Sequence, residues 1–275
     1  MSNPLFRLIQ QFADRNGIAI RRHVSAQEQE ALFKAIQPVR TEHELVRIGG
    51  KGDGGYLVPD DLEGITACFS PGVDVTADFE RALLDRGLRT FQIDGSINDT
   101  PLKHERNRFE AKFLGIVDDE NTITLDTWVR QSMGDEPGDL ILQIDIEGHE
   151  WLALAQVSDE TLRRFRIIVI ELHQLDAAFL AQGSTVIAPV LDRLRRHFDI
   201  VHLHANNCAP VIRGKVHAVA PAVEATLLRR DRSVQRQACD AIEHPLDRDN
   251  VPARPKVAIP RSMYALHAES NANAA

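Results

Sequence analysis

The chain has 275 residues, of which 43% are hydrophobic and 5% aromatic, and its formal net charge is −8. This length provides one sizeable core, which the low aromatic content requires to be built mainly from aliphatic side chains. A nucleic-acid binder usually shows a basic balance or a basic stripe, and this sequence shows neither. The composition therefore predicts an acidic globular protein with no nucleic-acid partner.

The cysteines and the N-terminus predict a cytoplasmic protein. Cys68, Cys208 and Cys239 are scattered and form no CxxC pair, which indicates reduced thiols rather than a disulfide framework. Charged residues interrupt the apolar positions of the N-terminus, so no signal peptide is expected. No apolar run approaches the ~20 residues of a membrane span.

The first part of the chain is predicted to be helical. Apolar residues recur with helical spacing between residues 3 and 38, and Pro38 ends the pattern. The segment Glu44–Pro59 has two short β-prone runs around a glycine-rich turn. It is expected to form a hairpin or an irregular loop.

From Ile65 onward, predicted strands and helices alternate along the chain. The predicted strands are Ile65–Ser70, Thr90–Ile93, Phe113–Val117, Leu140–Ile146, Ile167–Leu172, Ile200–His204 and Val223–Leu228. The predicted helices between them are Thr76–Arg86, Leu125–Met133, His149–Gln156 and Thr185–Phe198.

This alternation predicts an α/β fold. Strands that are apolar throughout are buried on both faces, which implies a mostly parallel sheet with helices on both sides. No helix pattern joins the last two strands, so the final strand is expected to be antiparallel. We expect a helical segment at 1–43, a Rossmann-like domain at 44–231 and an extended tail at 232–275. The tail is expected to wrap the surface loosely, with its last ~8 residues disordered.

Polar side chains follow almost every predicted strand. In an open parallel sheet, ligands bind outside the carboxyl ends of the strands. The residues at these ends are Ser70, Gly72, Asp94, Asp118, Asp145, Glu147, Gly148, His149, Glu150, Glu171, His173, His204, Asn206 and Asn207. Each of them alone can be a surface cap, but their convergence on one edge predicts a binding site there.

Gly72 and Asp94 are candidates for contact with a nucleoside. Gly72 allows the backbone to approach a ligand closely, and the helix that follows offers free N–H groups. Asp94 follows 22 residues later, close to the ~20 expected for an acid that binds ribose hydroxyls. The segment is not GxGxxG, so a dinucleotide is poorly supported. The alternatives are a tight strand–helix turn for Gly72 and a helix N-cap for Asp94.

A group of acids and histidines is the candidate catalytic set. Asp145 ends the central strand, where a buried carboxylate needs a partner. Glu147 lies on the same face, and two nearby carboxylates can raise one pKa or share a metal. His173 and His204 are candidate general bases or metal ligands, with a hydrogen-bonded core histidine as the alternative for each. His202 is expected on the opposite face from His204.

The glycine-rich loop RIGGKGDGGY is a candidate lid over this edge. Its Lys51, Asp53 and Tyr56 are placed to contact a cofactor or an acceptor. It does not open a helix and has no Walker Lys-Ser/Thr pair. The alternative is a simple β-turn.

Several motifs together resemble the FkbM-type methyltransferases. They are RIGGKGDGGYLVP, CFSPGVDVTADFERALLDRG, FQIDGS, TLDTWV, LILQIDIEGHEW, VHLHANNCAPV and VEATLLRR, which span about residues 44–230. The most specific is the D-I-E-G-H-E turn. The resemblance implies a Rossmann-like class I methyltransferase fold, in which a seven-stranded sheet has one antiparallel strand. It also implies S-adenosylmethionine as the donor and usually an oxygen acceptor on a sugar or other small metabolite.

The resemblance also implies roles for particular residues. Gly72 would approach the methionine part of the cofactor, Asp94 would hold the ribose, Asp118 would lie near the adenine, and Asp145 would lie beside the sulfonium. The expected cofactor-binding residues are Lys51, Ser70, Gly72, Asp94, Asp118 and Asp145, and the expected catalytic residues are Asp145, Glu147, His173 and His204. The sequence departs from the family at SPGVD, which has one glycine where many methyltransferases have two or three.

Three functions are compatible with these residues. The first is O-methylation of a sugar or other small-metabolite hydroxyl, with S-adenosylmethionine as cofactor and a divalent cation as a further candidate. The second is a metal-dependent hydrolase or lyase that uses the Asp/Glu/His cluster. The third is a binding or scaffold protein on a decayed methyltransferase fold. The acceptor and the oligomeric state stay open.

Overall fold

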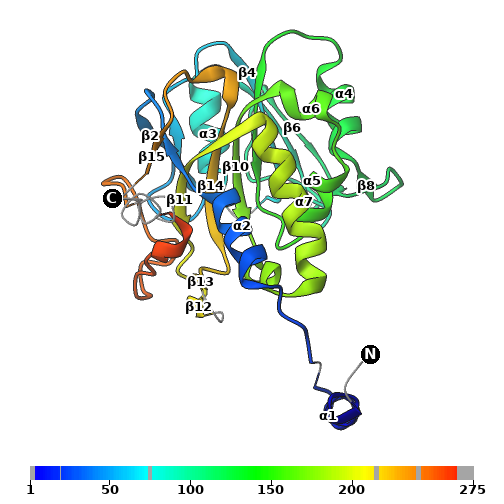
Figure 1. Cartoon of the computed structure of the whole chain (residues 1–275). Coiled ribbons are helices and arrows are strands. Elements are labelled where there is room, and N and C mark those ends of the chain that lie inside the picture. The colour runs from blue at the N-terminus through cyan, green and yellow to red at the C-terminus, as the bar shows by residue number, and fades with distance from the viewer. Residues whose placement is uncertain (1–3, 19, 74–75, 214–216, 240–242, 265–275) are drawn as a thin grey trace.

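The computed structural model describes residues 4–18, 20–73, 76–213, 217–239 and 243–264, and a seven-stranded sheet lies at its centre (Figure 1). The strand order is β11-β14-β10-β9-β4-β5-β6. The sheet strands are β4 (Ile65–Pro71), β5 (Arg89–Ile93), β6 (Asn107–Glu110), β9 (Asp139–Ile144), β10 (Phe165–Leu172), β11 (Phe198–Ala205) and β14 (Val223–Arg229). The helices are α1 (Pro4–Arg15), α2 (Ala26–Ile36), α3 (Asp78–Asp85), α4 (Leu125–Met133), α5 (Glu150–Gln156), α6 (Asp159–Arg164) and α7 (Ala181–His197).

The direction of the strands confirms the prediction from apolar runs. All neighbouring pairs are parallel except those of β14, which is antiparallel to both β10 and β11. In the middle of the sheet, Ile168 pairs with Leu142 on one side and Leu227 on the other. These side chains are buried, so the central strands need no polar face.

Two apolar layers cover the sheet. On one face, α3 and the hairpin of β2 (Leu45–Gly49) and β3 (Gly55–Pro59) enclose a core that includes Ile48, Phe79 and Val169. On the other face, α2, α4, α5 and α7 pack over a larger core. The predicted hairpin and the predicted helices on both faces are therefore confirmed.

The third sheet strand is not the predicted one. The sequence pattern placed it at Phe113–Val117, but β6 is Asn107–Glu110, and Phe113 belongs to the short strand β7 (Phe113–Leu114), which pairs with β8 (Thr122–Ile123). β6 forms the edge of the sheet, where β5 is its neighbour on one side, and of its four residues Asn107 is buried. Its sequence NRFE therefore lacks the apolar run by which buried strands are recognised.

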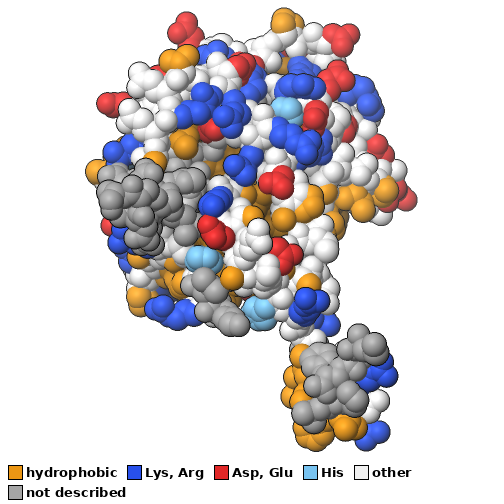
Figure 2. All heavy atoms as spheres, viewed as in Figure 1, with side chains coloured by type: hydrophobic (Ala, Val, Ile, Leu, Met, Phe, Trp, Pro, Cys, Tyr) orange, Lys and Arg blue, Asp and Glu red, His pale blue; other side chains and the backbone are white. Residues whose placement is uncertain are grey.

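The N-terminal helix α1 stands apart from the body of the molecule (Figure 1). Its Leu8, Ile9 and Phe12 side chains are exposed, and apolar side chains are visible on it in the space-filling view (Figure 2). No helix among the described residues is long and apolar enough to cross a membrane.

The described part of the tail is anchored, so the expectation that it wraps the surface loosely is wrong there. The Asn207 side chain pairs with the backbone of Val251, donating to its carbonyl and accepting from its N–H, both at 2.9 Å. The Asn250 amide donates to Asp53 and to Glu224 at 3.0 and 2.6 Å. Strand β15 (Gln237–Ala238) of the tail pairs with β1 (Val39–Arg40). Before the tail, the short strands β12 (Ile212–Arg213) and β13 (Ala218–Val219) pair with each other. The predicted disorder of the last ~8 residues lies outside the described residues.

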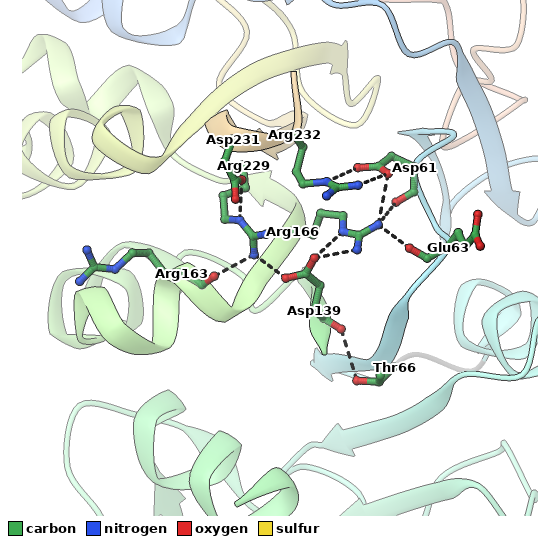
Figure 3. A network of polar contacts seen from close by, with 9 residues as sticks. All are labelled: Asp61, Glu63, Thr66, Asp139, Arg163, Arg166, Arg229, Asp231 and Arg232. Carbon is green, nitrogen blue, oxygen red and sulfur yellow. Dashed lines mark hydrogen bonds and ion pairs between the residues drawn. The ribbon is translucent and has the colours of Figure 1, made fainter. Parts of the chain in front are cut away.

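A network of arginines and aspartates ties the amino edge of the sheet together (Figure 3). The buried Arg166 guanidinium lies between Asp139 and Asp61, at 2.7 and 3.2 Å from their carboxylates, and also donates to the Asp61 and Glu63 carbonyls. A second arginine contacts each carboxylate: Arg229 lies 2.6 Å from Asp139, and Arg232 lies 2.8 Å from Asp61. The loop before β4, the start of β9 and the end of β14 are therefore held by charge.

Acid is expected to weaken this network. Burial acts to raise the pKa of Asp61 and of Asp139, but the arginines lower each pKa below 3.8 on balance. The unfolded chain therefore binds these protons first, so the stabilisation is complete above about pH 4 and is lost as the pH falls through the folded pKa values. Urea unfolding across this range should show the difference between wild type and Arg232→Ala shrinking with acid. A difference that stays constant would contradict the assignment.

Candidate active site

The ends of β4 and β9 meet at Gly72. Its φ is +85°, and a Cβ built there would lie 2.0 Å from the Asp145 carbonyl oxygen. The Gly72 N–H donates to the Ile93 carbonyl at 3.0 Å. Only glycine combines this backbone conformation with this close approach, so Gly72 brings the carboxyl ends of three neighbouring strands together.

A cavity of about 660 Å³ opens beside this junction. One wall is apolar and consists of Phe113, Ile116, Val117 and Leu152, whose side chains are all partly exposed to solvent. Polar and charged residues of the lining are Asp94, Ser96, Lys112, Asp119, Asp145, Glu147 and His149. A largely apolar pocket of this size with a few convergent polar groups is typical of a small-molecule site.

Asp94, directly after β5, organises the polar end of this cavity. One carboxylate oxygen accepts the Val73 N–H at 2.9 Å, and the other accepts the N–H and hydroxyl of Ser96 at 2.7 and 2.6 Å. The side chain therefore fixes the loops after both β4 and β5. It is held at the edge of the cavity by two backbone N–H groups and the Ser96 hydroxyl.

A second, more polar cavity of about 340 Å³ lies on the α3 side of the same junction. Its lining includes Asp53, Tyr56, Thr76, Asp78 and Gln143. Both cavities are lined by Gly72, Asp94, Asp145 and Glu147. The two spaces therefore meet at the ends of β4, β5 and β9.

An acid–histidine cluster lies next to this meeting point. The Nε2 atom of His173 is 3.9 Å from Asp145, 3.4 Å from Glu147 and 3.6 Å from Glu171. Asp145 follows β9 and Glu171 lies near the end of β10, the neighbouring strand, so the parallel pairing brings the two carboxyls together. Asn206, after β11, donates to Glu171 at 2.5 Å.

The fully buried Glu150 holds the cluster in place. It lies in the first turn of α5, and its two oxygens accept the N–H of Gly148 at 2.9 Å and the N–H of His173 at 2.8 Å. The Trp151 indole donates to the His173 carbonyl at 2.8 Å. The D-I-E-G-H-E turn and the end of β10 are thus fastened to each other, with the turn itself bent by the left-handed Glu147 and Gly148.

The cluster shifts the acidity of its members. Burial and the Glu171 charge raise the pKa of Asp145 to about 8, although His173 opposes this. Burial would lower the pKa of His173, but the nearby Glu150 carboxylate and the other carboxylates around the ring raise it to about 9. Burial also raises the pKa of Glu171. Near neutral pH the cluster therefore retains protons that isolated carboxyls would have lost.

The family comparison agrees with this geometry. Residues 83–203 match the family model described as the Methyltransferase FkbM domain. Over this segment the chain is similar to FkbM methyltransferase domains. The FkbM match begins within α3 and ends within β11, and it contains Asp94, Asp145, Glu147 and His173. The predicted class I methyltransferase fold is thereby confirmed. A search of curated proteins finds no match to the chain.

Within the matched segment, Asp118 does not end a strand of the central sheet as predicted, because residues 113–117 are not part of the seven-stranded sheet. Its carboxylate accepts the Thr124 N–H and the Thr127 hydroxyl, both at 2.7 Å, at the start of α4. The neighbouring Asp119 lines the larger cavity. The adenine contact expected of Asp118 stays a prediction, and its hydrogen bonds show a helix-start role.

Two other expected cofactor residues lie outside both cavity linings. Ser70 is fully buried, and its hydroxyl contacts Glu80 and Gln143. Lys51 is exposed in the turn between β2 and β3. Their predicted contacts are untested, whereas Asp53 and Tyr56 of the same glycine-rich loop line the smaller cavity.

His204 is not brought to the cluster, because β14 lies between its strand and β10. His204 Nδ1 is 3.9 Å from Asp247, and His202 Nε2 is 2.9 Å from the same carboxylate. The expectation that His202 and His204 face opposite ways is therefore wrong, since residues two apart in a strand share a face. Burial lowers the pKa of His204.

Sequence reasoning missed the roles of Glu150, Asp247 and Asn250. Glu150 was visible within D-I-E-G-H-E as an acid in the first turn of a helix, where it complements the helix dipole. Asp247 and Asn250 lie in the polar tail, and no local pattern connects them to β11 or to β14.

Proposed function

We propose that this chain transfers a methyl group from S-adenosylmethionine to a hydroxyl of a sugar or other small metabolite. The observation that carries the proposal is the meeting of two cavities at Gly72, Asp94 and Asp145, next to a carboxylate–histidine cluster. The larger, partly apolar cavity suits the adenosine part, and the smaller polar one suits the amino-acid part. The FkbM match supports a methyltransferase over the alternative hydrolase or lyase.

The residues of the two cavities fit this cofactor. A glycine stands where a Cβ would collide with backbone, so the chain can approach a ligand there. The Asp94 carboxylate is placed at the strand end where an acid accepts ribose hydroxyls. When bound, S-adenosylmethionine supplies an electrophilic methyl group.

The cluster then serves the acceptor. A carboxyl whose pKa is raised to about 8 is a stronger base than an ordinary aspartate, so Asp145 in its ionised form can take the proton of an acceptor hydroxyl. Glu171 and the protonated His173 keep that carboxyl in place, and Glu147 lies at the exposed rim. Alignment of the hydroxyl and the methyl group contributes of order 7–11 kcal/mol in the best cases. We further propose the division into 1–43, 44–231 and 232–275, with the catalytic domain in the middle.

Asp94 provides the first test. S-adenosylhomocysteine is expected to raise the melting temperature of the wild-type protein, and Asp94→Ala is expected to weaken its binding at least about tenfold, because charged hydrogen bonds to the ribose are lost. Calorimetric titration measures the affinity directly. Asp94→Asn keeps an acceptor for the Val73 N–H and separates loss of charge from loss of the loop.

Asp192→Ala is the matched control, because Asp192 is an exposed aspartate on α7 that lines neither cavity. It should bind the nucleoside as wild type does. Equal binding by Asp94→Ala and Asp192→Ala would overturn the cofactor assignment. For the acceptor, a transferred methyl group that survives mild alkali indicates an ether, whereas a methyl ester would be released.

A further inference from the structure

We infer that Asp145, Glu171 and His173 form a binding site for a divalent metal ion. Each residue offers one ligand atom, and these three atoms lie within 4.8 Å of one another. Two ligands of one cation at about 2.1–2.4 Å lie roughly 3–4.8 Å apart, depending on their angle at the ion. The preformed spacing therefore matches a shared ion.

The orientation of His173 points in the same direction. Its Nδ1 faces the fully buried Glu150 carboxylate at 3.3 Å, while Nε2 faces Asp145, Glu147 and Glu171. A carboxylate behind one ring nitrogen, with the other nitrogen directed at the ion, is the usual arrangement of a metal-bound histidine. Trp151 and Glu150 also hold the His173 backbone, so the ring position does not depend on the ion.

Hydrogen bonds from the His173 Nε2 atom do not account for this spacing. The Nε2–carboxylate distances of 3.4, 3.6 and 3.9 Å exceed the ~3.2 Å limit of an ordinary hydrogen bond. One proton on Nε2 can serve only one carboxylate at a time. A cation between the groups would attract all of them.

The charge balance favours a cation as well. Within the described part of the chain, the only basic side chain within 4 Å of the Asp145, Glu147 or Glu171 carboxylates is His173. By contrast, the partly buried Asp61 and Asp139 at the amino edge are each paired with two arginines. A buried carboxylate pair without such partners is stabilised by a bound cation. Two oxygens and one nitrogen suit Mn²⁺, which accepts both carboxylate and imidazole ligands.

The inference goes beyond the proposed methyl transfer, because ion binding is a property of the free protein. A bound ion would displace the protons of the ion-free cluster, so Asp145 would then act as a ligand rather than as a base. The ion would place positive charge beside an acceptor oxygen and act there as a Lewis acid. That role rests on the proposed function, whereas the binding itself does not.

Mn²⁺ titration of untagged, chelator-treated protein tests the site, with calorimetry and electron paramagnetic resonance as readouts. Wild type should bind one Mn²⁺, and Mg²⁺ should compete. Glu171→Gln, which keeps the shape of the side chain, should weaken Mn²⁺ binding at least about tenfold. His173→Ala should do the same, while its backbone stays held by Glu150 and Trp151.

Glu224→Gln is the matched control. Glu224 is a buried carboxylate on β14, in register with Glu171 on the neighbouring strand β10. A glutamine there can still accept the hydrogen bond from Asn250. The same substitution there should change Mn²⁺ affinity less than about threefold. If Glu224→Gln weakens binding as much as Glu171→Gln, or if wild type binds no Mn²⁺, the inference is overturned.

S-adenosylhomocysteine binding separates the two proposals and reports on folding. Glu171 lines neither cavity, and nucleoside titration of Glu171→Gln shows whether the variant is folded. Nucleoside binding without Mn²⁺ binding would remove the metal site and leave the proposed function. Mn²⁺ binding without nucleoside binding would leave the metal site and overturn the proposed function.

Discussion

Replacing Arg166 with leucine is expected to lower the free energy of unfolding by about 3–5 kcal/mol, the range for a buried ion pair that loses one partner. Arg166 is 5% exposed and serves two carboxylates and two backbone carbonyls. Leucine satisfies none of them. Asp139 and Asp61 each keep one arginine, so the unpaired carbonyls of Asp61 and Glu63 contribute much of the loss. Urea unfolding at neutral pH measures the effect.

Arg195→Ala is the comparison for this variant. Arg195 is half exposed on α7 and lies 3.8 Å from Asp192. Exposed pairs of this kind contribute at most about 1 kcal/mol, so the control should unfold nearly as wild type does. If the two variants were equally stable, the amino-edge network would contribute no more to stability than an exposed ion pair does.

Gly72→Ala is expected to abolish nucleoside binding and to destabilise the protein by about 2 kcal/mol or more. The left-handed backbone alone costs roughly 1–2 kcal/mol for a residue with a Cβ. The added carbon would also lie 2.0 Å from the Asp145 carbonyl oxygen, so the ends of β4 and β9 must separate. Both cavities lie at that junction. Urea unfolding and titration with S-adenosylhomocysteine give the two readouts.

Gly87→Ala isolates the backbone term. Gly87 has a φ of +91°, and the nearest atom to an added Cβ is 3.7 Å away on the Arg106 side chain. This variant should lose only the conformational part of the stability and should keep its affinity for the nucleoside. Retained affinity in Gly72→Ala would show that the close contact with Asp145 is not what shapes the site.

The sequence predicted the parts of the fold that buried residues determine. The apolar runs around Ile168 and Leu142 indicated central strands, and the missing helix before β14 indicated its antiparallel direction. The meeting of Asp145 and His173 also followed, because parallel neighbours end at one edge. Gly72 and Asp94 could be placed there for the same reason.

The remainder depends on contacts that no local pattern encodes. β6 is an edge strand whose NRFE sequence has no apolar run. His204 lies near the end of β11, and His173 directly follows β10, so both come at strand ends in the sequence. The two residues are separated because β14 lies between these strands, which only the sheet order reveals. The Asp247 partner of His202 comes from the tail, at a separation that no spacing rule covers.

The anchoring of Asn250 has a consequence for the evolution of the chain. The Asn250 amide donates to Asp53, which lines the polar cavity, and to Glu224 on β14, so a segment beyond the matched residues helps to hold one wall of that cavity. The sheet edge and the closing segment are separate stretches of sequence. Exchange of the C-terminal segment between relatives would therefore change the support of Asp53 beside the polar cavity, while the strand ends that line the cavity stay unchanged.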